Sequence, residues 1–176
     1  MARAGRAAAL GFAAFVGGCS LFGKGPQPPC PSFAVVEDAG RLVDFRPGPG
    51  RDLTDVRLEA EIADVSQTCE YDADGFVDTN IVVDFVAARG PAADSAIGRL
   101  SYFVALTDPA GAILAKEVFP VEAELGDIGI RRRLRDEVTQ HIVFAPARDA
   151  RDFKSFIGFQ LTPEQLDDNR HQRHPG

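Results

Sequence analysis

Residues 77–85 read VDTNIVVDF, and this stretch decides the fold of the chain. The β-prone residues at every second position, from Val77 to Phe85, alternate with mostly polar residues such as Asp78 and Asp84. Successive side chains of a strand point to opposite faces of a sheet, so a period of two predicts a strand with one buried and one solvated face.

The same period recurs along most of the chain. Val56, Leu58 and Ile62 share one face of a strand that is expected to continue, past a bulge near Asp64, to Tyr71. Strands are predicted over residues 33–37, 42–45, 56–71, 77–85, 100–106, 113–121, 138–144 and 153–161. The core is expected to contain Ile81, Val83, Phe85, Val104, Ile142 and Phe159.

Short strands separated by turn signals, with no strand–helix alternation, favour an all-β fold. We therefore predict an antiparallel β-sandwich of about seven strands over residues 33–170, with an architecture like that of immunoglobulin and fibronectin type III domains. A short C-terminal helix follows, because Thr162 is a good N-cap, Pro163 suits the first helical position and Gln165 can complete a capping box. Residues 171–176 are polar and are expected to fray.

The segment Asp72–Asp78 has two interpretations. Alternating carboxylates around Gly75 resemble part of a calcium loop, but Val83 stands where an EF-hand would supply its bidentate Glu. Asp74-Gly75 between two alternating strands is also a strong hairpin signal. We predict the hairpin and no metal site.

The N-terminus has the anatomy of a signal peptide. Two arginines, Arg3 and Arg6, precede an apolar run over residues 7–16, which is too short to span a membrane. The run ends in Val16-Gly17-Gly18-Cys19, which resembles the lipobox of bacterial lipoproteins. The resemblance implies a signal peptide over residues 1–18, diacylglycerol and palmitate on Cys19, and a bacterial envelope location; Ser20 favours the outer membrane, facing the periplasm. Residues 19–32, rich in Gly and Pro, are expected to form a linker.

If Cys19 carries lipid, Cys30 and Cys69 remain. The periplasm is oxidising, so we predict that they form a disulfide, which would close a loop of about 40 residues. Two buried free thiols are the alternative. The sequence Pro28-Pro29-Cys30-Pro31 is poorly suited to a core residue and favours the disulfide.

The body of the chain resembles an uncharacterised family of envelope lipoproteins of alphaproteobacteria. The resemblance spans most of the mature chain, including GRDLTDV at residues 50–56 and GFQLTPEQL at residues 158–166. It implies an envelope location and assigns no activity to any residue.

The net charge of −7 argues against binding to nucleic acid or to anionic lipid surfaces. The one basic run, from Arg131 to Arg135, is expected to be a solvated loop or the start of a strand. The stretch from Arg46 to Asp55 can form a ligand-binding loop; alternatively, Asp52 or Asp55 pairs with Arg51 or caps a turn.

Signals for catalysis are weak. The chain has three histidines, of which His171 and His174 lie in the C-terminal tail and His141 is expected on the solvated face of a strand. No nucleophile elbow, metalloprotease motif or phosphate loop is present. We expect no catalytic residue and no cofactor.

The leading hypothesis is a non-enzymatic, lipid-anchored interaction module of the envelope. Its partner would be another envelope protein, bound through an exposed sheet edge or through loops. The alternative is an accessory ligand-binding lipoprotein for a transporter or a cell-wall polymer, which would need a deep apolar pocket. A periplasmic hydrolase is the third class.

Overall fold

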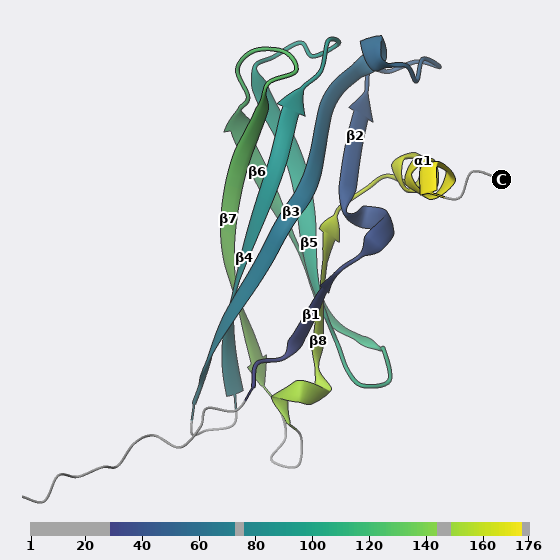
Figure 1. The fold of residues 1–176 in the computed structure, drawn as a ribbon. Helices are drawn as coiled ribbons and strands as arrows, with labels where there is room; N and C mark the ends of the chain where they lie inside the picture. The colour runs from purple at the N-terminus through teal and green to yellow at the C-terminus, as the bar shows by residue number, and fades with distance from the viewer. Residues whose placement is uncertain (1–28, 73–75, 144–148, 174–176) are drawn as a thin grey trace, which may run out of the picture.

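The computed structural model describes residues 29–72, 76–143 and 149–173. In these ranges the chain forms eight strands, one α-helix and three short 3-10 helices (Figure 1). The strands are β1 (Ser32–Val35), β2 (Arg41–Phe45), β3 (Val56–Tyr71), β4 (Phe76–Arg89), β5 (Ile97–Thr107), β6 (Ile113–Glu124), β7 (Arg131–Val143) and β8 (Lys154–Phe159). The helices are η1 (Glu37–Ala39), η2 (Leu53–Asp55), η3 (Ala150–Asp152) and α1 (Pro163–Arg173).

The strands form two four-stranded sheets, in the orders β1-β8-β5-β6 and β2-β3-β4-β7. All pairings are antiparallel except that of β1 with β8. The predicted β-sandwich is confirmed, with eight strands in the described residues rather than about seven. The likeness to immunoglobulin domains is one of architecture, since β2, β3 and β4 follow one another within one sheet.

The long hairpin of β3 and β4 is the centre of the second sheet. Its register shifts between Ile62 and Asp64, so the bulge predicted near Asp64 is present. A bulge lets side chains on both sides of it keep the same face toward the core. Asp72 N–H donates to the Phe76 carbonyl at 3.1 Å across the end of the hairpin, whose tip, residues 73–75, lies outside the described residues.

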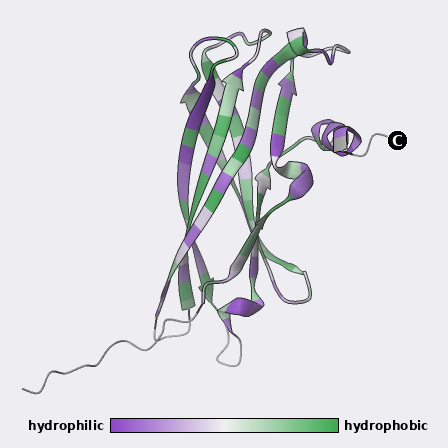
Figure 2. Cartoon of the chain, in the orientation of Figure 1, coloured by the Kyte–Doolittle hydropathy of each residue, from purple (hydrophilic) through white to green (hydrophobic). Residues whose placement is uncertain are grey.

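The core fills the space between the two sheets. Figure 2 shows hydrophilic and hydrophobic residues alternating along the strands, as half-buried strands require. The Phe85 ring lies 5.2 Å from the Tyr102 ring and 5.7 Å from the Phe159 ring, measured between centroids. All six residues predicted for the core are buried: Ile81, Val83, Phe85, Val104, Ile142 and Phe159.

Polar side chains divide this core into two clusters. The smaller cluster contains Val77, Leu106 and Ile142. Between it and the main cluster, Ser155 on β8 donates its hydroxyl hydrogen to Oε1 of Gln140 on β7 at 2.9 Å. Buried polar groups that hydrogen-bond across the sandwich fix how one sheet sits on the other.

The end of the linker is held against β3. Cys30 and Cys69 form the predicted disulfide, with 5.8 Å between their Cα atoms. Nearby, Gln67 Nε2 donates to the Pro31 carbonyl at 2.7 Å, and the Tyr71 hydroxyl donates to the Pro29 carbonyl at 2.6 Å. The chain from Pro29 onward therefore belongs to the domain, although residues 19–32 were expected to form a linker.

Helix α1 begins as predicted. Thr162 N–H donates to Gln165 Oε1 at 2.9 Å and Gln165 N–H donates to Thr162 Oγ1 at 3.2 Å, which completes a capping box. The helix continues to Arg173, three residues into the segment expected to fray. Figure 2 shows α1 as hydrophilic along most of its surface, so apolar burial is not its main attachment to the domain.

Candidate functional site

The two sheets have four edges, formed by β1, β6, β2 and β7. An uncovered strand edge exposes unpaired backbone N–H and C=O groups, and proteins usually protect it by covering, by shortness or by charge. How each edge is protected therefore indicates where this domain can accept a partner.

The β2 edge is covered by α1, which lies beside it in Figure 1. Asn169 Nδ2 donates to the carbonyls of Asp38 and Arg41, each at 2.8 Å. Gln165 Nε2 donates to the Val43 carbonyl at 3.4 Å. The helix thus satisfies backbone acceptors of β2 with its own side chains, which explains why a hydrophilic helix docks there.

The β7 edge carries six charged residues between Arg131 and Glu137, and the β1 edge is only four residues long. The basic run from Arg131 to Arg135 forms the start of β7, which confirms the second of its two interpretations, a strand start rather than a loop. Arg135 binds Asp84 on β4 through two hydrogen bonds of 2.8 Å and lowers the pKa of that carboxyl, and Arg131 pairs with Glu61. Charged side chains along an edge disfavour the addition of another strand.

The β6 edge is twelve residues long and is covered by no other described element, and its first half carries only two charged residues, Lys116 and Glu117. Every residue of the segment Ile113–Val118 is exposed, whereas every second residue from Phe119 onward is half-buried against the core. Three large apolar side chains lie in this segment, with exposed fractions of 66% for Ile113, 53% for Leu114 and 48% for Val118. The hairpin that joins β5 to β6 projects away from the lower ends of β3, β4 and β7 (Figure 1). We call residues 113–118 the open half of β6.

An aromatic and cationic surface adjoins the open half of β6 on the outer face of its sheet. Lys116 Nζ lies 4.3 Å from the centroid of the Phe103 ring, and Lys154 Nζ lies 4.9 Å from that of Phe156. Strand pairing aligns Lys116 with Ala105 and Phe156, and Val118 with Phe103. These two rows carry no carboxylate in the described residues, although the chain has a net charge of −7.

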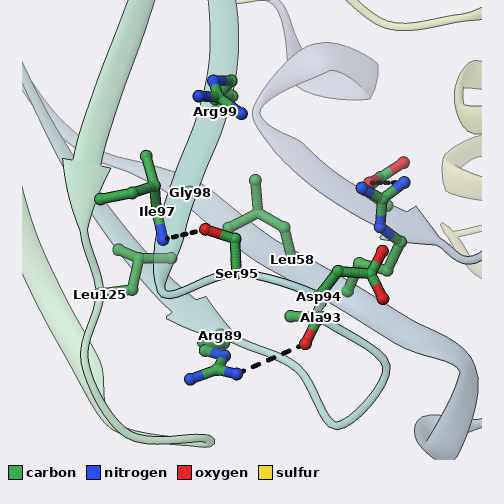
Figure 3. Close-up of a pocket in the computed structure, with 11 residues that line it drawn as sticks. Leu58, Arg89, Ala93, Asp94, Ser95, Ile97, Gly98, Arg99 and Leu125 are labelled. Atoms are coloured by element: carbon green, nitrogen blue, oxygen red, sulfur yellow. Dashed lines mark hydrogen bonds and ion pairs between the residues drawn. The ribbon is translucent and has the colours of Figure 1, made fainter.

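A small pocket lies at the end of the sandwich where β4 ends and β5 begins (Figure 3). Its volume is about 110 Å³. Three arginines line it: Arg57 is 3.7 Å from Asp44, Arg99 is 2.6 Å from Glu122, and Arg89 donates to backbone carbonyls. The charges of Arg57 and Arg99 are thus compensated within the protein, and the pocket is smaller than the roughly 300–1,000 Å³ of a typical ligand pocket.

The stretch from Arg46 to Asp55 forms a braced turn. Asp52 caps η2 by accepting a hydrogen bond of 2.7 Å from the Thr54 N–H, so the expectation of a capped turn is confirmed. Asp55 is buried and pairs with Arg46 at 2.5 Å, not with Arg51. A side chain on Gly50 would collide with the Asp55 carboxylate, so glycine is required there.

Arg51 attaches this turn to α1. Its guanidinium donates to the carbonyls of Gly48 at 3.0 Å and Gly50 at 2.8 Å, and it lies 3.6 Å from Glu164 and 3.9 Å from Asp168. A cavity of about 420 Å³ adjoins these residues. The contacts of Arg51 brace α1 against this turn, and because Arg46 and Arg51 already have acceptors, neither of these two described arginines is a free cation for a ligand.

His141 lies on the solvated face of β7, as predicted. Its Nδ1 is 2.6 Å from Asp78 Oδ1, and its ring lies 4.5 Å from that of Phe76. Both members of the His141–Asp78 pair are substantially exposed. In the described part of the chain no serine or cysteine hydrogen-bonds to His141, so the pair lacks the nucleophile that a catalytic triad needs.

Cys19, His174 and Asp74 lie outside the described residues. The ranges 29–72, 76–143 and 149–173 contain no cluster of three potential metal-ligating side chains. Within those same ranges, no helix has both the length and the apolar character needed to cross a bilayer. Comparisons with protein-family models, with curated proteins and with solved structures gave no match.

A strand was predicted over residues 113–121, but its open half was not singled out. Two signals were present. The residues Ile113, Leu114 and Ala115 do not alternate with polar residues, and Pro120 is typical of an edge strand because it cannot donate to a sheet.

Proposed function

We propose that this chain is a non-enzymatic interaction module of the bacterial cell envelope. A lipid on Cys19 anchors it in the outer membrane, and the domain faces the periplasm. It binds an extended segment of another envelope protein along the open half of β6. The observation that carries this proposal is the exposure of all residues from Ile113 to Val118 on a strand whose outer edge is unpaired in the described residues.

Strand addition explains why this edge differs from the others. A peptide that pairs with a sheet edge gains affinity from main-chain hydrogen bonds and specificity from alternate side chains. Such a peptide would cover Val118 and the Phe103 ring on the outer face of the sheet, and Ile113 at the start of the strand. The three remaining edges carry α1, a run of charges or a strand of only four residues, which disfavour the same mode of binding.

A lipid anchor on Cys19 would limit how far from the membrane surface the domain can meet its partner. A fully extended chain from Cys19 to Pro29 spans at most about 35 Å. The disulfide of Cys30 with Cys69 then fixes the chain to the domain. The binding edge is therefore presented close to the membrane surface, where it meets membrane proteins or their extended periplasmic segments.

Site-specific photo-cross-linking in the producing cells tests the proposal. A photoreactive amino acid replaces Leu114 in one variant and Ile128 in the other, because these side chains have nearly equal exposed fractions of 53% and 52%. We expect Leu114 to give a discrete adduct with one envelope protein and Ile128 to give none. Equal adducts from both positions, or none from Leu114, would contradict binding at β6.

A further inference from the structure

We propose that the strand accepted by β6 carries an acidic side chain opposite Lys116 and a basic side chain at the neighbouring position, opposite Glu117. The inference rests on the proposed function and specifies the chemistry of the partner. Two exposed charges of opposite sign on opposite faces of the open half of β6 carry it.

Lys116 provides the cationic half of the pattern. Its ammonium lies over the Phe103 ring, and it makes no ion pair among the described residues. Lys154 occupies the same face in the same way, over Phe156. A carboxylate arriving beside Lys116 therefore meets cationic and aromatic groups and no competing anion in the adjacent rows.

Glu117 provides the anionic half. It pairs in register with Val104, whose side chain is buried between the sheets, so the Glu117 side chain lies on the opposite face of β6 from Lys116. Glu117 is exposed and makes no ion pair among the residues that the structure describes. A cationic side chain on that face of an added strand completes the pair.

The two positions fix a short motif. Side chains directly opposite each other on paired strands lie on the same face. An added antiparallel strand therefore reads apolar, basic, acidic from its N-terminus, opposite Val118, Glu117 and Lys116 respectively. A parallel strand reads acidic, basic, apolar.

A second copy of this chain fits the pattern poorly. A two-fold axis perpendicular to the sheet keeps each side chain on its face, so it aligns only residues whose numbers are both even or both odd. Centred on Lys116 or Glu117, it places identical charges opposite each other, which is destabilising. Centred on Ala115, it leaves Lys116 and Glu117 facing residues 113–114, which are apolar, so neither charge gains a counter-charge.

Fluorescence anisotropy with the full chain tests the motif. The probe is fluorescein-labelled Thr-Val-Lys-Glu-Thr-Val-Thr-Val, and the control peptide has its Lys and Glu exchanged. Wild-type protein is expected to bind the probe about tenfold more tightly than the control, because two attractive cross-strand pairs become two repulsive ones. The double variant Lys116→Glu/Glu117→Lys is expected to reverse this preference.

Two N-methylated versions of the probe separate the motif from the edge itself. Each version blocks alternate amides, so only one of them blocks the edge that faces β6. Loss of binding with one version alone supports strand addition; equal binding of both would overturn the proposed function. If strand addition holds but wild type and double variant do not differ in peptide preference, the charge motif is wrong. Cross-linking of Leu114 to a second copy of the chain would also overturn the charge motif. So would a result in which neither labelled peptide binds.

Discussion

The Tyr102 hydroxyl on β5 donates a hydrogen bond of 2.9 Å to Asp136 Oδ2 on β7, and so joins the two sheets of the sandwich. Tyr102 is fully buried at the centre of the main core cluster. The pKa of this hydroxyl is raised above its ordinary value. Burial is the larger cause, and the hydrogen bond to the Asp136 carboxylate is the second. The two sheets are therefore connected by a group that must stay protonated.

This contact predicts a loss of stability at alkaline pH. Because the folded-state pKa of Tyr102 is raised, its contribution is fully present below a pH of about 10 and is lost as the pH rises above that value. Urea unfolding between neutral pH and pH 12 should show this decline, and Tyr102→Phe should reduce it. Tyr71→Phe is the control, because Tyr71 is only half-buried and should change the decline less.

The second prediction concerns the core. Phe85→Ala and Phe159→Ala should each lower the free energy of unfolding by about 3–5 kcal/mol, since both rings are buried. Ile128→Ala should change it by less than about 0.5 kcal/mol, because Ile128 is exposed. Denaturant titration of the three variants checks the prediction. Losses below about 1 kcal/mol for both phenylalanines would mean that this packing is not what stabilises the domain.

The third prediction concerns the disulfide. The bond links residues 39 apart in sequence, and the chain-entropy model assigns about 4 kcal/mol to a loop of that length. Cys69→Ser should lower the free energy of unfolding by roughly this amount, as should reduction of the wild-type protein. Alkylation without reductant should label neither Cys30 nor Cys69 in the exported protein. Quantitative labelling of both would contradict the disulfide.

The fourth prediction concerns the anchor. Protein extracted from membranes should have an intact mass that corresponds to a chain beginning at Cys19 with its acyl chains attached. Cys19→Ala should release the protein from the membrane fraction, because the domain's acidic surface gives it little affinity for anionic lipid. A variant that stays equally membrane-bound would rule out lipidation as the means of attachment.

The fifth prediction concerns the segment Asp72–Asp78. If it is a hairpin turn alone, millimolar calcium and chelator should give the same melting temperature. A site occupied at about 100 times its Kd would add roughly 2.7 kcal/mol and raise the melting temperature by several degrees. A shift that Asp74→Ala abolishes would identify a calcium site and change the interpretation of this end of the domain.

The sequence by itself determined where most of the strands lie and which face of the central ones is buried. A period of two is a local property, so Ile81, Val83 and Phe85 could be assigned to the core before their partners were known. The bulge between Ile62 and Asp64 and the capping box of Thr162 and Gln165 were also readable, because both depend on near neighbours in sequence.

Apart from the predicted hairpin of β3 and β4, only the tertiary structure decided which strands pair and which edges stay open. Sheet order depends on contacts between residues far apart in the chain, and side-chain periodicity carries no information about a strand's neighbours. Asn169 covers β2 from more than a hundred residues away, a contact that no local pattern indicates. Likewise, the exposure of the open half of β6 arises because the opposing sheet does not cover it, which is a property of how the two sheets are placed and not of the residues 113–118 themselves.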